Sequence, residues 1–338
     1  MEEKIVKLSI VTLSWNTLAL TKQCLESVIS SLCLVASDKE SNTLPITSHK
    51  SPATSHQPLT TEIIIVENGS TDGSVEYIKS VISDQLSGVG KKSRAPLTAH
   101  RSPITIKLIT NKENVGFTKG NNQGINKARG KYVMLLNSDT IVKPGAISKM
   151  IDYLDKNSEV DCIAPRLLNI DGTFQENCGH FPNLGVVFIM LFKEHFGGSD
   201  SVRYAPLKSD FVDWMMGSAI IARREVFDKI GGLDERIFMY MEEVDWFYRV
   251  HKAGFKSYCL IDAEIIHLGR GSSTTGKKDP ILGIYRGLLI YYRKHKTKSE
   301  LLLLIVMLKL KAVLALLLGY LKNDTYLKET YGQAVKIN

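Results

Sequence analysis

The sequence predicts an α/β protein in which a mostly parallel sheet is flanked by helices. Apolar runs that read as buried strands alternate with segments whose apolar residues recur at helical spacing. Each strand run in the first half ends in a polar cluster, as at the ligand edge of a parallel sheet. With 338 residues, 44% of them apolar and 23% charged, the chain has ample material for one large core with or without an appendage.

The first strand is predicted at 7–14, KLSIVTLS, and apolar residues at helical spacing follow from Leu18 to Leu32. A second strand at 62–66, EIIIV, ends in the turn-rich sequence ENGSTDGS. A short helix should follow this turn, with Asp72 or Ser70 as its N-cap.

The third strand is predicted at 104–110, ITIKLIT, and a helix should run from about Thr118 to Arg129. Gly130 is placed to end that helix. The fourth strand run is KYVMLLNSD, 131–139, and Pro144 is expected to open the next helix at its first turn. Beyond residue 205 the predicted elements become shorter.

Two stretches rich in Ser, Thr, Pro and Lys interrupt this order, at 36–61 and at about 83–103, and both are predicted to be loop insertions. The organisation expected is one domain over 1–275 that contains these insertions. A basic and apolar helical tail over 276–338 follows it.

Charge and cysteine content limit the function classes. The net charge is +8, and the basic cluster at 286–298 suits anionic lipid or nucleic acid, although a solvated face is the commoner role. The five cysteines are odd in number and contain no CxxC pair, which argues against a disulfide framework and a zinc site. A reducing cytosolic compartment fits this pattern, and no signal peptide is expected before the first strand.

Four polar clusters follow the predicted strands: SWN at 14–16, ENGSTD at 67–72, NVGF at 114–117 and NSD at 137–139. Asp139 could bind a divalent cation together with substrate phosphates, or it could simply cap a turn; the triplet alone favours the turn.

The glycines of GFTKGNNQG, 116–124, could let an anion approach a helix N-terminus, or could only serve a turn. Glu67 ends an apolar strand and needs a partner, which could be a nucleobase imide, a ribose hydroxyl or a nearby lysine.

The segment FMYMEEVDW, 238–246, places three carboxylates at the start of a helix that is expected to begin near Tyr240. Glu242 and Asp245 lie three residues apart and share a face, while Glu243 is rotated by about 100°. One acid could act as a general base while its neighbours pair with cations or cap the helix. Arg249, four residues after Asp245, is the predicted partner of that aspartate.

A charged helix face explains the acids of this segment but not Phe238, Tyr240 and Trp246, which suit stacking against sugar rings. His267 follows an apolar strand, where a lone histidine is usually structural. The chain could also return this histidine to the crevice as a metal ligand.

Taken in order, these motifs resemble the family 2 glycosyltransferases of the GT-A fold, a Rossmann-like architecture, and they are most similar to the branch that contains bacterial rhamnosyltransferases. The resemblance runs from about residue 7 to 275. The segments that carry it are SIVTLSWN, IIIVENGSTDGS, NVGFTKGNNQGI, YVMLLNSDT, DWMMGSAIIARREVFDKIGGLDERIFMYMEEVDW and EIIHLGRGSS.

By this resemblance Glu243 is the catalytic base, beside Glu242 and Asp245, and Asp139 with His267 binds Mg²⁺ or Mn²⁺. Trp214 and Gly217 are implied on the acceptor side. The implied donor-nucleotide contacts are Ser14, Trp15, Asn16, Glu67, Asn68, Gly116, Asn121, Asn137 and Ser138.

The chain departs from the family pattern in three places. Glu67 and Glu243 stand where aspartate is usual, and the Asn-Ser-Asp triplet supplies one certain carboxylate to the metal.

The implied reaction is an inverting transfer of a sugar from a nucleotide-diphosphate sugar, dTDP-rhamnose by analogy, to a saccharide or lipid-linked acceptor. The alternative is a non-catalytic nucleotide-sugar or carbohydrate-binding protein of the same fold. A dinucleotide-dependent oxidoreductase would need a glycine fingerprint, and LSWNTLAL has none. Nucleic acid is not expected, because only the basic tail favours it.

The apolar run at about 299–322 is expected to hold the protein at the cytoplasmic face of the membrane without crossing it. Lys309 and Lys311 lie mid-run, where charge opposes spanning, and both are expected to reach the headgroups from the flanks of a flat helix. The alternative is packing on the domain or on a second copy of the chain in a homo-oligomer.

Overall fold

The computed structural model describes residues 6–34, 59–87, 104–192, 202–269 and 278–337. Its centre is a ten-stranded sheet with the order β10-β13-β6-β12-β4-β1-β2-β3, while β5 pairs with β13 and β7 pairs with β6. The strands are β1 Leu8–Ser14, β2 Thr61–Glu67, β3 Ile104–Thr110, β4 Tyr132–Leu136, β5 Thr140–Val142, β6 Cys162–Leu168, β7 Phe174–Gln175, β10 Asp210–Phe211, β12 Ala219–Arg223 and β13 Ser257–His267.

The pairing directions confirm the predicted mostly parallel sheet. β1 is parallel to β2 and β4, β2 to β3, and β6 to β13, while β12 runs antiparallel between β4 and β6. A small second sheet has the order β11-β8-β9, formed by Trp214–Met215, Cys178–Gly179 and Arg203–Tyr204. Alternate strand residues face opposite sides, so the large sheet has two apolar faces to cover.

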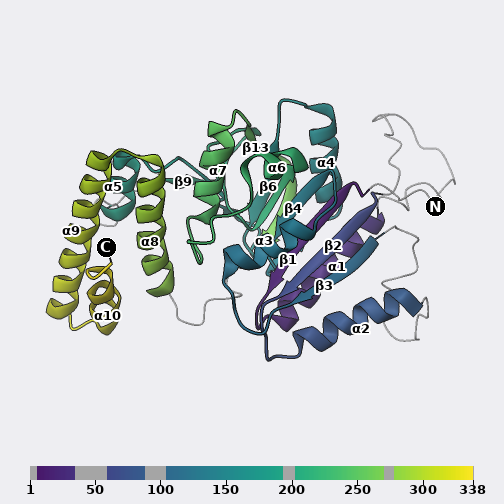
Figure 1. Ribbon diagram of the computed structural model, residues 1–338, viewed down its shortest axis with the longest axis horizontal. Coiled ribbons are helices and arrows are strands. Elements are labelled where there is room, and N and C mark those ends of the chain that lie inside the picture. The colour runs from purple at the N-terminus through teal and green to yellow at the C-terminus, as the bar shows by residue number, and fades with distance from the viewer. Residues whose placement is uncertain (1–5, 35–58, 88–103, 193–201, 270–277, 338) are drawn as a thin grey trace.

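Helices cover both faces (Figure 1). The helices of the described chain are α1 Leu18–Leu34, α2 Ser74–Ser87, α3 Phe117–Lys127, α4 Ala146–Lys156, α5 Leu184–Phe192, α6 Arg224–Ile230, α7 Glu242–Lys252, α8 Lys278–His295, α9 Lys298–Leu321 and α10 Thr325–Ala334. Of these, α5, α8, α9 and α10 lie together to one side of the sheet in Figure 1. Ile10 of β1 shares one buried cluster with α1, α2 and α4, and Val11 shares the other with α3 and α7. The predicted helical spacing after the first strand is therefore confirmed, because it is the buried face of α1.

Several predicted boundaries are wrong for local reasons. Residues 83–87 belong to α2 rather than to an insertion, and Thr61 already lies in β2. The rest of the two predicted insertions falls largely on 35–58 and 88–103, outside the described residues. α3 ends at Lys127, and Gly130 instead allows a close backbone approach, since a Cβ there would lie 2.6 Å from the Ser9 nitrogen.

Two helix starts also differ from prediction. α4 begins at Ala146, after Pro144 and a left-handed Gly145 (φ 74°). Asp72 serves two helices: its carboxylate accepts hydrogen bonds from the Ser74 nitrogen at 3.1 Å and from the Leu18 nitrogen, at the start of α1, at 2.8 Å. Asp72 thereby ties the first two polar loops together.

The C-terminal helices share the core that contains α7. Buried residues of α8 and α9, among them Tyr291 and Leu304, belong to the same cluster as Trp246. α9 packs against α8, α10 and α5 and lies at the outer edge of the molecule in Figure 1. Residues 278–337 therefore pack onto the rest of the chain through α8 and through the contact of α9 with α5.

Candidate active site

Hydrogen bonds join the loops that follow β1 and β2 at the carboxyl edge of the sheet. Asn16 (φ 50°) donates its backbone N–H to Ser70 Oγ at 2.8 Å, and its side-chain oxygen accepts from the Thr71 nitrogen at 2.8 Å. The parallel register Ser14↔Glu67 produces this meeting, because both strands end at the same level. Trp15 is half-buried, while Ser14 is buried with its hydroxyl 2.9 Å from that of Thr21.

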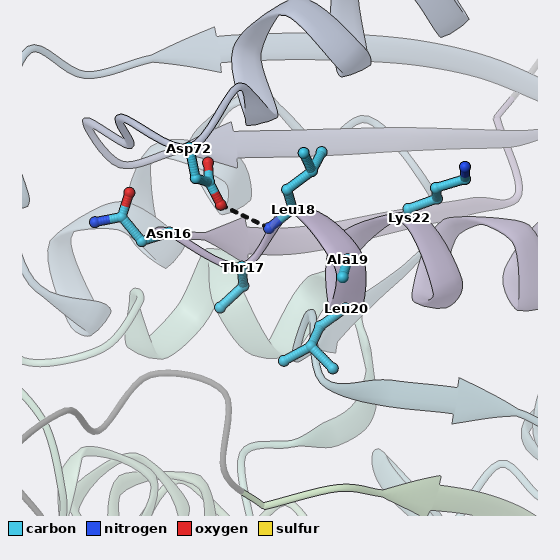
Figure 2. Close-up of a pocket in the computed structure, with 7 residues that line it drawn as sticks. All are labelled: Asn16, Thr17, Leu18, Ala19, Leu20, Lys22 and Asp72. Atoms are coloured by element: carbon cyan, nitrogen blue, oxygen red, sulfur yellow. Dashed lines mark hydrogen bonds between the residues drawn. The ribbon is translucent and has the colours of Figure 1, made fainter.

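A hollow of about 560 Å³ opens beside this edge, at the start of α1 (Figure 2). Its lining includes the exposed Asn16, together with Lys22 and Asp72. In Figure 2 the Asp72 carboxylate points at the Leu18 nitrogen, so its capping bond forms part of the wall.

Glu67 and Asn68 are buried, and their partners are backbone and amide groups of the loops. The Glu67 carboxylate accepts from the backbone nitrogens of Gly69 at 3.1 Å and Ser70 at 3.0 Å. The lysine that was one alternative partner for Glu67 is not among these bonds. Asn68 donates to Asn114 Oδ1 at 2.8 Å and accepts from the Val115 nitrogen at 3.1 Å, which fixes the next loop.

The loop before α3 is shaped by a glycine. Gly116 has φ 94°, and a Cβ there would lie 2.7 Å from the Phe238 ring. Asn121 is buried and donates to the Phe117 carbonyl at 2.9 Å. The exposed Phe238 is therefore held above the glycine turn, at the start of the acidic segment.

Asp139 and His267 come together although 128 positions separate them in the sequence. The antiparallel pairing of β5 with β13, with Thr140 opposite His267, places Asp139 Oδ1 3.5 Å from His267 Nε2. The other ring nitrogen, Nδ1, lies 2.7 Å from Gln175 Oε1, which fixes the orientation of the imidazole. Ser138 Oγ lies 3.3 Å from Thr17 Oγ1, and the Asn137 nitrogen donates to the Ser218 carbonyl at 2.9 Å.

This corner fits a divalent cation that uses substrate phosphates as further ligands. Two ligand atoms at about 2.1 Å from one ion, at right angles, lie about 3 Å apart, close to the Asp139–His267 spacing. Within the described part of the chain, no three His, Cys, Asp or Glu side chains are grouped for metal binding. Asp139 and His267 would therefore leave further coordination positions to water or phosphate oxygens.

Glu242 and Glu243 open α7 immediately after two residues in the left-handed region, Tyr240 (φ 70°) and Met241 (φ 73°). Gly217 faces this turn, and a Cβ built on it would lie 3.9 Å from Glu243 Cβ. Among the described residues, one carboxylate oxygen of each glutamate is buried without a hydrogen-bond partner. Such atoms are costly to bury, so the pair is suited to receive a ligand or a proton.

Burial raises the pKa of both glutamates. The pKa of Glu242 is the more strongly raised, because the neighbouring Glu243 carboxylate adds repulsion to desolvation. For Glu243 burial also raises the pKa, but a hydrogen bond from its own backbone N–H and then the positive charge of Arg203 oppose the shift. The pair should therefore hold its protons to higher pH than an exposed glutamate does.

Asp245 has a structural position. It is fully buried and forms the predicted pair with Arg249 at 2.9 Å, together with Lys294 at 2.9 Å and His295 at 2.7 Å from α8. Burial would raise its pKa, but hydrogen bonds from His295, Lys294 and Arg249 outweigh this and lower the pKa to about 2.

The aromatic side chains divide between core and surface. The expectation that Trp246 stacks on a sugar is wrong, because it is buried against Phe227 and donates to the Gly231 carbonyl at 3.1 Å. Phe238 remains exposed. Trp214 is also buried; its ring packs over Gly179 and its N–H reaches the His180 carbonyl at 2.9 Å.

Two residues of the site were missed by sequence reasoning. Gln175 orients His267, and Arg203 of β9 lies close enough to Glu243 to lower its proton affinity while donating to the Glu176 carbonyl at 2.9 Å. Neither stands in a recognisable motif. β7 pairs with the preceding strand β6, which also pairs with β13, and β9 pairs with the preceding strand β8, so these residues reach the site through sheet pairing rather than through a motif.

Comparisons with known proteins show which family the chain matches. The family model described as Glycosyl transferase family 2 matches residues 9–244. An N-acetylglucosaminyl-diphospho-decaprenol L-rhamnosyltransferase of Mycobacterium tuberculosis is 26% identical over 222 residues, which are 61% of this chain and 66% of that protein. A low-salt glycan biosynthesis hexosyltransferase of Haloferax volcanii is 27% identical over 200 residues, or 56% and 61% of the two chains. The alignments thus cover less than two thirds of either relative.

Solved structures share the fold. GalNAc-T7 with UDP, GalNAc and Mn²⁺ gives a TM-score of 0.55 at 14% identity, over 86% of this chain and 48% of that one. S. aureus TarS 1–349 in complex with UDP-GlcNAc gives 0.53 at 13% identity, over 97% and 79%. The expected GT-A type architecture is confirmed, and at these identities the likeness is one of fold alone.

Proposed function

This chain belongs to glycosyl transferase family 2, and we propose that it transfers a sugar from a nucleotide-diphosphate sugar to an acceptor hydroxyl with inversion. The observation that carries the proposal is the Glu242–Glu243 pair, in which Glu242 is buried and Glu243 is half-buried beside Gly217. The pKa of both is raised, and one carboxylate oxygen of each has no hydrogen-bond partner among the described residues. A structural acid would have its oxygens paired, as those of Asp245 are.

Glu243 is the proposed general base. Its carboxylate accepts the proton of the acceptor hydroxyl as the new bond to the anomeric carbon forms and the bond from that carbon to the diphosphate oxygen breaks. Glu242, whose pKa burial and the Glu243 carboxylate raise well above its usual range, keeps a proton, so that the pair carries a single negative charge. Arg203 favours the ionised form of Glu243 before the acceptor arrives.

The donor is proposed to lie along the carboxyl edge of β1, β2 and β4. Asn16, the loop of Glu67 and Asn68, and the Gly116 turn form the nucleotide side. Asp139 and His267 would hold Mg²⁺ or Mn²⁺, which would supply positive charge to the departing diphosphate.

The sugar and the acceptor are proposed from the relatives. Rhamnosyl from dTDP-rhamnose is the preferred donor group, because a rhamnosyltransferase is among the most similar proteins. That protein is named for an acceptor linked to decaprenol through a diphosphate, so a lipid-linked saccharide acceptor at the cytoplasmic face of the membrane is proposed here. Cell-surface polysaccharide or glycan synthesis is the corresponding process.

The test is a panel of nucleotide-diphosphate sugars offered with Mg²⁺ or Mn²⁺ and saccharide or lipid-linked acceptors, with release of nucleoside diphosphate and glycosylated product measured. The matched variants are Glu243→Gln and Glu225→Gln, since Glu225 is an exposed glutamate of α6. Product formation by the wild type and by Glu225→Gln, but not by Glu243→Gln, is expected. If the folded protein binds a nucleotide sugar and transfers nothing to any acceptor, the non-catalytic alternative replaces this proposal.

A further inference from the structure

The outer face of α9 is a continuous apolar surface. Nine large apolar side chains of this helix are exposed, and at about 100° per residue they project within an arc of about 120°. They are Leu302, Leu303, Val306, Leu310, Val313, Leu314, Leu317, Tyr320 and Leu321. The opposite face is buried and includes Leu304, Leu308, Ala312, Ala315 and Gly319. Exposed apolar patches of this extent on soluble proteins usually mark an interaction site.

The two mid-helix lysines of α9, Lys309 and Lys311, do not point to this face, which corrects the expectation that they reach the headgroups from its flanks. Lys309 donates to the carbonyls of Val335 and Ile337 at the end of α10. Lys311 is buried, and its ammonium lies 5.9 Å from the centre of the Phe192 ring. Consequently no charged side chain projects into the apolar arc between Ser299 and Leu321.

The net charge of the C-terminal residues indicates which partner this surface would bind. Residues 278–338 hold eleven lysines and arginines against four acids, a net charge of +7 out of the +8 of the whole chain. Exposed Arg286, Arg293 and Lys298 lie on α8 and at the start of α9. Exposed basic side chains in the same C-terminal segment as an apolar face are complementary to anionic headgroups above acyl chains, whereas two copies of the chain would add their positive charges to each other.

We propose that the outer face of α9 is a docking surface for an anionic membrane, in which the helix lies flat at the boundary between headgroups and acyl chains. α9 is long and apolar enough to cross a bilayer, but its inner face packs on α8, α10 and α5 and is not available to lipid. Lying flat uses only the exposed face. This inference deepens the membrane location proposed above, and its test requires no catalysis.

α8 links the docking surface on α9 to the segment that contains Glu242 and Glu243. α8 contacts that segment closely, since a Cβ on Gly287 would lie 2.6 Å from Met241 Cβ, and Lys294 and His295 of α8 bind Asp245. A flat α9 would therefore hold Glu242 and Glu243 near the membrane surface, where a lipid-linked acceptor presents its sugar.

The experiment is flotation of the purified full chain with vesicles of phosphatidylcholine alone or of an equal mixture with phosphatidylglycerol. The test variant is the double substitution Leu310→Glu and Leu314→Glu. The control is Leu207→Glu, which changes an exposed leucine outside α9. We expect the wild type and the control to float with the mixed vesicles, less with phosphatidylcholine alone, and the double variant to lose about tenfold or more of the bound fraction.

Thermal melting of each variant and its molar mass in solution complete the test. Equal binding by a folded double variant, or no binding of the wild type to either vesicle, would overturn the proposal. A wild-type dimer that the double variant converts to a monomer, without vesicle binding by either, would assign the face to a second copy instead. Nucleoside diphosphate release with a soluble acceptor and no vesicles is scored separately, so failure of docking and failure of transfer remain distinguishable.

Discussion

Replacing Asp245 by asparagine separates structural from catalytic acids in α7. The substitution removes a fully buried negative charge that Arg249, Lys294 and His295 contact at 2.7–2.9 Å. Breaking a buried ion pair by removing one partner costs roughly 3–5 kcal/mol, because the remaining charges are left uncompensated. At roughly 2 °C per kcal/mol for a chain of this size, Asp245→Asn should lower the melting temperature by about 5–10 °C.

The pH dependence gives a second estimate. The pKa of Asp245 is lowered from 3.8 to about 2, which corresponds to about 2.5 kcal/mol of stability. Because the pKa is depressed in the folded state, this stability is present above pH 3.8 and is lost as the pH falls towards 2. The stability difference between the wild type and Asp245→Asn should therefore shrink with acidification.

The assay is calorimetric melting at neutral and acidic pH, together with turnover measured well below the melting temperature. Asp228→Asn is the control, since Asp228 pairs with Arg224 at the surface, where such a pair contributes only about 0–1 kcal/mol. Turnover of folded Asp245→Asn should stay within a few-fold of the wild type. A variant that melts like the wild type but loses its turnover would show that Asp245, not Glu243, is the base.

Four further outcomes are expected. Glu243→Gln should reduce turnover by about 10²-fold or more with unchanged melting and donor binding, and retained turnover would assign the base elsewhere. Because the pKa of Glu243 is raised and the base must be ionised, kcat/KM should fall as the pH drops through a value above 4.5, and a flat profile to pH 4.5 contradicts this. Excess chelator should abolish turnover, Mg²⁺ or Mn²⁺ should restore it, and Asp139→Asn should lose most of it; full activity in chelator refutes the metal site. Gly287→Ala should lose about 1–3 kcal/mol of stability and lower kcat, because the new Cβ would lie 2.6 Å from Met241 Cβ. The control is Gly332→Ala, whose Cβ would have its nearest neighbour at 3.9 Å, and it should be close to neutral in melting and turnover assays.

Local pattern alone was sufficient for much of the framework. The third strand was predicted at its observed bounds, Ile104–Thr110, and the α1 spacing gave its buried face, because side-chain periodicity records which face meets the core. The pairing of Asp245 with Arg249 was also within reach of sequence, since residues four apart meet on one helix face.

Contacts between distant segments were decided only by the tertiary structure. The approach of Asp139 to His267 depends on the β5–β13 register, and the addition of Lys294 and His295 to Asp245 depends on where α8 docks. Tryptophan is a residue type that stacks on sugars, and lysine is one that contacts lipid headgroups. Trp246 and Lys311 are nevertheless both buried, by neighbours that no local sequence pattern specifies. Residue type and spacing set what a side chain is able to bind, whereas packing against segments far along the chain sets whether it faces the site, the core or the surface.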